Sequence, residues 1–192
     1  NILPVYKLGT AENVNNIKAN TDRAIEKGSK VIKKHSMKFS GVEKNPQIDD
    51  AYLLIGKACF YAQDYKSAEA TFSMIMGRYK DKKEMYEPMI WLALTYSKSK
   101  KYSECDILLD QVKNKMDEGK APKKLNNFLY TVYAENALAQ GKNALAVEYF
   151  KKRKFTFFQS ELNTRLLFIE GQIYQKANEY EQATKCFKKT AR

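Results

Sequence analysis

The stretch Asp49–Tyr79 most constrains the fold, because its apolar residues follow the spacing of two short helices joined by a tight turn. It reads DDAYLLIGKACFYAQDYKSAEATFSMIMGRY. On the first helix, the residues spaced by three and four positions are Tyr52, Ile55, Gly56 and Cys59. On the second helix, the residues with this spacing are Ala68, Phe72 and Ile75. Asp64 and Tyr65 are expected to close the turn.

The same pattern recurs three more times along the chain. The small residue on the first helix, Gly56, is matched by Ala93, Ala134 and Gly171. The small residue on the second helix, Ala68, is matched by Cys105, Ala146 and Ala183. The large residue on the second helix, Phe72, is matched by Leu109, Phe150 and Phe187. Small residues are expected where the two helices of a hairpin approach closely, and large residues where one hairpin meets the next.

Repeats of this length and pattern are typical of tetratricopeptide repeats, in which each helix-turn-helix hairpin buries the apolar face of its neighbour. The sequence therefore predicts an all-α fold, a right-handed tetratricopeptide-repeat solenoid. We expect residues 1–45 to form an N-terminal lead-in and a degenerate half-repeat helix, and residues 46–192 to form four repeats. The half-repeat helix is predicted from about Asn13 to His35. Because no polar capping helix follows the fourth hairpin, we expect a fragment of a longer protein.

The first helices line the concave side of such a solenoid, and the repeat register predicts which side chains face this groove. They are Leu53, Lys57, Phe60, Ile90, Leu94, Thr131, Glu135, Leu138, Phe168 and Gln172. Mixed apolar and polar groups suit a bound peptide or helix, which apolar anchors would hold and Lys57 or Glu135 would place in register. Contact with a neighbouring segment of the same chain is an equal alternative. Glu170 stands where the first repeat is apolar, so it should face a groove or meet a Lys or Arg.

The net charge of +12 would attract nucleic acid or an anionic membrane. However, 22 acidic residues are interspersed with the basic ones, and no RNA-binding signature accompanies them. The densest basic run, Lys151-Lys152-Arg153-Lys154, has two interpretations. It could meet phosphate or an acidic protein, or it could be a solvated helix end before a buried loop. We expect no specific nucleic-acid partner, and no apolar run is long enough to span a membrane.

Signatures of catalysis and of metal or cofactor binding are missing from the sequence. It contains no Gly-rich phosphate loop, no GxSxG and no HExxH, and the single histidine, His35, cannot supply a His-based metal cluster. Cys59, Cys105 and Cys186 have neither zinc-site nor disulfide spacing and are expected to be small buried residues. The sequence thus predicts a non-enzymatic protein with no catalytic residues, no metal and no cofactor.

Beyond the generic repeat, two strings resemble one particular family. They are KHSM and IDDAYLLIGKA, within SKVIKKHSMKFSGVEKNPQIDDAYLLIGKACFYAQDYKSAEATF. The likeness extends through RLLFIEGQIYQKANEYEQA and covers most of this chain, but only part of a longer family member. The family is that of the gliding-motility and type IX secretion lipoproteins of Bacteroidota, called SprE or PorW. The resemblance implies a lipoprotein at the periplasmic face of the outer membrane that bridges motor or ring components to the translocon. It implies no catalytic residues.

We therefore expect a scaffold that binds protein or peptide partners in an envelope secretion or gliding machinery. Its contact with the membrane would be only through a lipid anchor outside this chain. The alternative is a soluble, cytoplasmic co-chaperone or regulatory adaptor that binds a peptide in its concave groove. A carboxylate clamp for chaperone tails is not reproduced, because its positions hold Leu53, Lys57 and Trp91. An upstream signal peptide ending in a lipid-modified Cys would fit only the lipoprotein.

Overall fold

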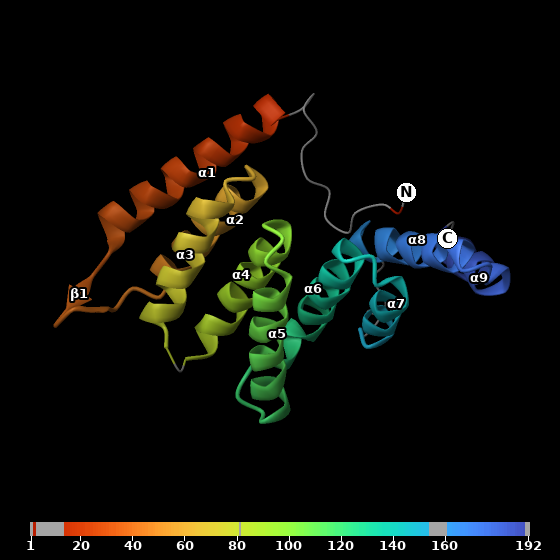
Figure 1. The fold of residues 1–192 in the computed structure, drawn as a ribbon. Helices are drawn as coiled ribbons and strands as arrows, with labels where there is room; N and C mark the ends of the chain where they lie inside the picture. The colour runs from red at the N-terminus through yellow and green to blue at the C-terminus, as the bar shows by residue number, and fades with distance from the viewer. Residues whose placement is uncertain (1, 3–13, 81, 154–160, 191–192) are drawn as a thin grey trace. The chain divides into compact units, whose positions relative to one another are not determined.

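The computed structural model describes residues 2, 14–80, 82–153 and 161–190, and its secondary structure is almost entirely α-helical (Figure 1). The chain divides into two compact units. The N-terminal unit is Leu8–Pro122, and the C-terminal unit is Lys123–Arg192 together with Asn1–Lys7. Each unit is described separately below.

The N-terminal unit consists of one long helix followed by two helical hairpins. Its α-helices are α1 (Val14–His35), α2 (Gln47–Tyr61), α3 (Tyr65–Arg78), α4 (Tyr86–Lys98) and α5 (Tyr102–Asp117). A 3₁₀ turn, η1 (Lys83–Met85), precedes α4, and a small hairpin of β1 (Lys38–Phe39) and antiparallel β2 (Val42–Glu43) follows α1. Contacts join α1 to α2, α2 to α3, α3 to α4 and α4 to α5, so each helix packs on its successor (Figure 1).

The C-terminal unit contains two further hairpins. Its elements are the 3₁₀ turn η2 (Lys123–Leu125) and the helices α6 (Asn126–Ala139), α7 (Asn143–Lys151), α8 (Glu161–Lys176) and α9 (Tyr180–Thr190). The core of this unit lies between the hairpins, where Phe150 of α7 packs with Ile169 and Ile173 of α8 and Ala183 of α9. Ile2 is packed against the same core.

The predicted helices agree closely with those observed. The half-repeat helix runs over Val14–His35, one residue from the predicted start. Pro88 suits the first turn of a helix and predicts a start near Glu84–Glu87, and α4 begins at Tyr86. Gly41 and Pro46 predict a surface loop over residues 36–47, and the structure has the short β hairpin in this segment. The predicted division into residues 1–45 and 46–192 stays a prediction, and the predicted lead-in falls mostly outside the described residues.

One turn geometry recurs in all four hairpins and defines the repeat register. The second residue after each first helix has positive φ, and these residues are Gln63 (61°), Lys100 (62°), Gly141 (74°) and Asn178 (61°). The next residue donates its N–H to a carbonyl five positions earlier, in the pairs Asp64 to Cys59, Lys101 to Tyr96, Lys142 to Ala137 and Glu179 to Tyr174. This is the Schellman helix end, so the four repeats share one backbone device. Asp64 also accepts from the N–H of Ser67, as expected for the first turn of α3.

Lys100→Gly is expected to raise the free energy of unfolding by about 1 kcal/mol, because glycine adopts positive φ without the steric cost that a side chain incurs. Lys100 is exposed, so little packing is lost. Gly141→Ala, at the matching turn, is the control and should lower stability by a similar amount. Urea denaturation followed by circular dichroism measures both. Equal signs for the two variants would contradict the role assigned to this turn.

The glycines on the first helices lie where the predicted close approach occurs. A Cβ at Gly56 would lie 2.5 Å from Cε1 of Phe72, and a Cβ at Gly171 would lie 2.5 Å from Cε1 of Phe187. The ring of Phe72 also stacks on Trp91 of α4, with centroids 6.2 Å apart and planes 20° apart. Phe72 therefore fills the space between its own hairpin and the next, as predicted.

The β hairpin is held by one carboxylate. Glu43 accepts from the Ser36 hydroxyl (2.5 Å) and from the backbone N–H groups of Met37 (2.8 Å), Lys44 (3.1 Å) and Asn45 (3.0 Å). These hydrogen bonds, that of Ser36 above all, lower the pKa of Glu43 from 4.5 to about 2. Asn45 in turn donates its side-chain amide to the carbonyl of His35, the last residue of α1.

We expect acid to loosen this hairpin before the helices. Because the folded pKa of Glu43 is depressed, its stabilising contribution is fully present above pH 4.5 and is lost as the pH falls towards 2. NMR should show the Met37 and Lys44 amide resonances shifting within that interval. In Glu43→Gln the shifts should disappear. A midpoint near 4.5 in the unmodified chain would contradict the hydrogen-bonding arrangement.

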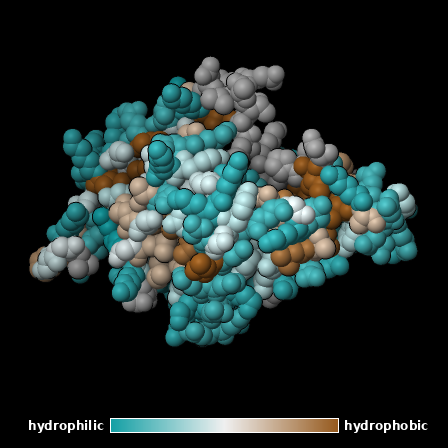
Figure 2. All heavy atoms as spheres, viewed as in Figure 1, coloured by the Kyte–Doolittle hydropathy of each residue, from teal (hydrophilic) through white to brown (hydrophobic). Residues whose placement is uncertain are grey.

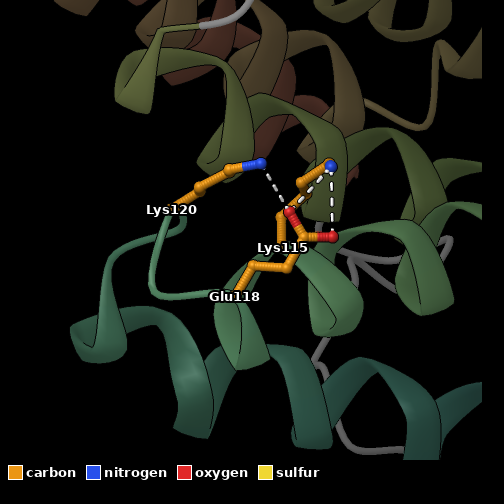
Figure 3. A network of polar contacts seen from close by, with 3 residues as sticks. All are labelled: Lys115, Glu118 and Lys120. Carbon is orange, nitrogen blue, oxygen red and sulfur yellow. Dashed lines mark hydrogen bonds and ion pairs between the residues drawn. The ribbon is translucent and has the colours of Figure 1, made fainter.

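A second polar network lies at the end of α5 and joins Lys115 in its last turn to Glu118 and Lys120 after it. Glu118 lies between Lys115 (3.0 Å) and Lys120 (2.8 Å), as Figure 3 shows. Hydrogen bonds from both lysines lower the pKa of Glu118, with that of Lys120 foremost. All three side chains are exposed, so salt screens their attraction and the network orients the loop more than it stabilises the fold.

Candidate functional site

Half of the residues predicted to face a groove are not accessible. Buried positions are Phe60 (0% exposed), Ile90 (0%), Leu94 (0%), Thr131 (1%) and Glu135 (4%). Ten of the 13 residues of α4 are buried, so that helix has almost no solvent face from which Ile90 or Leu94 could reach a partner. The assignment of these five residues to an open groove is therefore wrong.

The ring cluster around Trp91 explains the burial of Phe60. The centroid of the Phe60 ring lies 5.5 Å from that of Trp91, 5.7 Å from that of Tyr65 and 5.6 Å from that of Tyr61. Offset and edge-on aromatic pairs of this kind stabilise a core beyond the area that they bury. Phe60 therefore belongs to the packing between α2, α3 and α4 and is not a partner anchor.

The predicted residues that remain accessible are Leu53, Lys57, Leu138, Phe168 and Gln172. On α2 and α4, Lys57 pairs with Glu87 (2.8 Å), and its ammonium lies 5.3 Å from the centroid of the Trp91 ring. Tyr61, 38% exposed, packs edge-on against Trp91 at 6.1 Å, and Leu54 is 46% exposed. We name the accessible residues Leu54, Lys57, Tyr61 and Glu87 the α2–α4 surface, and buried Trp91 lies beneath it.

A second accessible face lies on α8 in the C-terminal unit. Phe168 is 39% exposed, and the centroid of its ring lies 5.3 Å from that of Phe187, which itself covers Gly171. Gln172 and Gln175 follow on the same side of the helix at three- and four-residue spacing. We name Phe168, Gln172 and Gln175 the α8 surface. On the face seen in Figure 2, hydrophobic residues form separate spots among hydrophilic ones.

The repeat register did not predict Leu54 and Tyr61 as accessible residues, although they stand next to the predicted Leu53 and Phe60. A one-residue error in the helical register moves a position by about 100° around the axis, and this error exchanges a buried position with an exposed one. The presence of two adjacent aromatic residues, Phe60 and Tyr61, was the available signal. Of such a pair on a helix with one buried face, only one is expected to be buried.

Each of the three described residues of the basic run contacts other residues of the chain. Arg153 is buried and donates from Nη2 to the Asn163 side-chain oxygen of α8 at 2.8 Å. The ammonium of Lys152 lies 5.8 and 5.5 Å from the ring centroids of Tyr130 and Tyr149, and that of Lys151 lies 5.8 Å from the centroid of Tyr174. These contacts favour the interpretation that the basic run is a helix end, and they argue against a phosphate site there. Lys154 lies outside the described residues.

Glu170 has cations in its surroundings but forms no ion pair with a Lys or Arg among the described residues, so its two predicted alternatives stay predictions. The carboxylate is half-buried, and burial raises its pKa, while the charges of Lys151, Lys189 and Arg153 and a hydrogen bond with Tyr174 act in the opposite direction.

A cavity of about 410 Å³ opens between α7 and α8, with Val147 and Ile173 among its apolar residues. It can accept an apolar side chain.

The cysteines are buried free thiols, as predicted. Burial raises the pKa values of Cys59, Cys105 and Cys186, which disfavours the reactive thiolate. Within the described ranges, no group of three His, Cys, Asp or Glu side chains is placed to hold a metal ion. His35 is exposed at the end of α1. None of the described helices combines the length and apolarity needed to cross a membrane.

Comparison with solved structures shows a likeness to the crystal structure of BtubC (BKLC) from P. vanneervenii. The two share 10% sequence identity over 95% of this chain and 91% of that one, with a TM-score of 0.55. At this identity the likeness shows the fold alone. The predicted all-α, helix-turn-helix repeat fold is confirmed. No protein-family model and no curated protein matches the chain, and the resemblance to the SprE or PorW family stays a prediction.

Proposed function

We propose that this chain is a non-enzymatic scaffold for protein–protein interaction in an envelope secretion or gliding machinery of the type IX kind. The observation that carries the scaffold role is the α2–α4 surface, where Leu54 and Tyr61 lie exposed beside the Lys57–Glu87 ion pair. An exposed Tyr beside a fixed charge pair suits recognition of a partner helix or peptide, because the ring supplies contact area and the charges set orientation. The envelope setting rests on the sequence resemblance alone.

In this setting the chain would stand at the periplasmic face of the outer membrane, held by a lipid anchor outside the sequence considered. It would bind protein components of the machinery and have neither a specific nucleic-acid partner nor a cofactor. The alternative, a cytoplasmic adaptor that binds a peptide, uses the same surfaces. The two differ in what precedes the repeats, so the upstream sequence of the full-length gene separates them.

A photo-crosslinking residue placed at Tyr61 tests the proposal. In cells of a Bacteroidota host it should capture a secretion or motility component of the envelope. The same residue at Ile107, which is 56% exposed on the second helix α5, is the matched control and should capture none. Capture of a cytoplasmic chaperone would favour the alternative, and equal yields at both positions would contradict a partner site on α2 and α4.

Tyr61→Ala and Phe168→Ala are each expected to weaken binding of that component by roughly 1–2 kcal/mol, because exposed aromatic anchors supply much of an interface's energy. Isothermal titration calorimetry with the purified component measures the loss. Ile107→Ala and Tyr180→Ala are matched controls, because both remove an exposed apolar side chain from a second helix. Losses confined to the controls would place the interface on the second helices.

A further inference from the structure

A cavity of about 270 Å³ lies between the β hairpin and the end of α3 in the N-terminal unit. The proposed scaffold role does not use it. Its described lining residues are Lys38, Gly41, Glu43, Arg78, Tyr79 and Lys82. Three of these six carry a positive charge, and they come from β1, from the last residue of α3 and from the segment that follows it.

Arg78 has an unfilled hydrogen-bonding position. Its guanidinium carbon lies 4.7 Å from the centroid of the Tyr52 ring on α2, so the group is held by a cation–π contact. Its Nη1 atom is buried and has no hydrogen-bond partner in the described part of the chain. A buried donor without an acceptor is costly, and it marks a place where a water or an ion is to be expected.

Glu43 offsets only one of the three positive charges of this cavity. Both of its oxygens are already engaged, one by the Ser36 hydroxyl and the other by backbone N–H groups of the hairpin. Among the described residues no ion pair forms with Lys38, Arg78 or Lys82. Lys82 instead places its ammonium 5.9 Å from the centroid of the Tyr79 ring. In the described part of the chain, these three cations therefore have no carboxylate within ion-pair distance.

We propose that this cavity binds a phosphate monoester dianion. With the charge of Glu43 included, its described lining residues carry a net charge of +2, which matches the roughly −1.5 to −2 of a phosphate ester at neutral pH. A guanidinium presents parallel N–H donors that fit two phosphate oxygens, and two lysines add point charges. A carboxylate would leave about one positive charge unmatched.

The end of α3 offers a simpler role for Arg78 and Lys82, since cations are stabilised near the last carbonyls of a helix. That role does not explain Lys38, which belongs to β1 and not to α3 or the segment that follows it. It predicts that removing Arg78 lowers stability and that phosphate has no specific effect. The two roles thus differ in a measurable way, and the inference is independent of the proposed scaffold function.

Titration calorimetry of the whole chain at fixed ionic strength tests the proposal with inorganic phosphate, phosphoserine, sulfate and acetate as ligands. Phosphate and phosphoserine should bind at least about tenfold more tightly than acetate. Tighter binding of phosphoserine would identify a phosphorylated partner side chain as the source, and equal binding would identify the free anion. A sulfate affinity equal to that of phosphate would support recognition of a tetrahedral dianion. Absence of phosphate binding overturns the site.

Variants separate this cavity from general attraction to a basic protein. Lys38→Gln and Lys82→Gln, both at exposed positions, should each weaken phosphate binding several-fold, and Arg78→Gln more strongly. Because Arg78→Gln removes the contact with Tyr52 and can lower stability, the two lysine variants alone suffice for the test. Lys33→Gln and Lys66→Gln remove one charge each from exposed positions of the same unit and should have no effect. Equal losses in all four lysine variants would overturn the proposal.

Discussion

Gly56→Leu is expected to lower the free energy of unfolding of the N-terminal unit by roughly 3 kcal/mol. Even a Cβ atom at this position would lie 2.5 Å from the Phe72 ring, which is fully buried and stacked on Trp91. The ring cannot move aside without disturbing the contact between the first and second hairpins. The larger side chain must therefore separate α2 from α3.

Gly56→Ala should lower stability by about 1–2 kcal/mol, although alanine favours helix more than glycine does. The matched control is Gly77→Ala on α3, where a Cβ would meet nothing within 4 Å. There only the helix preference operates, so stability should rise by up to about 1 kcal/mol. Opposite signs for the same substitution on adjacent helices would isolate the steric effect.

The second repeat suggests how to compensate the clash. Where the first repeat has Gly56 and Phe72, the second has Ala93 and Leu109. Alanine is larger than glycine and leucine is smaller than phenylalanine, so the two differences in volume offset each other. Phe72→Leu should therefore cost less in the Gly56→Ala background than in the unmodified chain. The double-mutant cycle should give a coupling energy of about 1 kcal/mol. Strict additivity would contradict direct contact between positions 56 and 72.

Trp91 makes these measurements specific to the N-terminal unit. It is the single tryptophan of the chain, and it contacts Phe60, Tyr61 and Phe72. Urea denaturation followed by tryptophan fluorescence therefore reports unfolding of this unit, while circular dichroism reports both units. The Gly56 variants should shift the fluorescence transition. An unchanged transition would refute the assigned register.

The second large effect is expected at the buried arginine of the C-terminal unit. Arg153→Leu should lower the free energy of unfolding by roughly 2–4 kcal/mol, because it removes a charged donor and leaves buried polar groups near it with fewer partners. Arg153 and Asn163 are 8% and 6% exposed, and their side chains are 2.8 Å apart. Circular dichroism during urea denaturation measures the change.

Lys152→Leu is the control for this arginine, since it removes the neighbouring charge at an exposed position. It should change stability by less than about 1 kcal/mol, the usual value of an exposed cation–π contact. A cycle with Asn163→Ala should show coupling between positions 153 and 163. Equal losses in the Lys152 and Arg153 variants would mean that the run acts through its overall charge.

Contacts between residues of neighbouring helices could be predicted from the sequence, because they recur with the repeat. Matching small and large residues between repeats predicted close packing at Gly56, Phe72 and Gly171, and the structure shows this close packing. Such pairs depend only on helical spacing and on the packing of one hairpin with the next. A helix end at Gly141 could also be predicted, because glycine favours positive φ, and φ is 74° there.

The accessible surface was harder to predict, because exposure depends on how several helices pack together. Phe60 and Tyr61 are adjacent, and spacing alone did not show which of the two packs against Trp91. The Arg153–Asn163 bond joins a residue just after α7 to a residue in the first turn of α8, and no periodic pattern marks such a pair. That Nη1 of Arg78 is buried without a hydrogen-bond partner among the described residues depends on tertiary packing, which the helical periodicity of the sequence does not reveal.

The three buried thiols have a consequence for how the repeats open. Cys59, Cys105 and Cys186 stand in three different hairpins, and each is shielded while its hairpin is closed. The rate at which each thiol reacts with an added disulfide reagent therefore reports how often its own repeat opens transiently. Equal rates for Cys59 and Cys105 would mean that the N-terminal unit opens as one cooperative block. Different rates for the three thiols would mean that the hairpins open separately, each coupled only to its nearest neighbours.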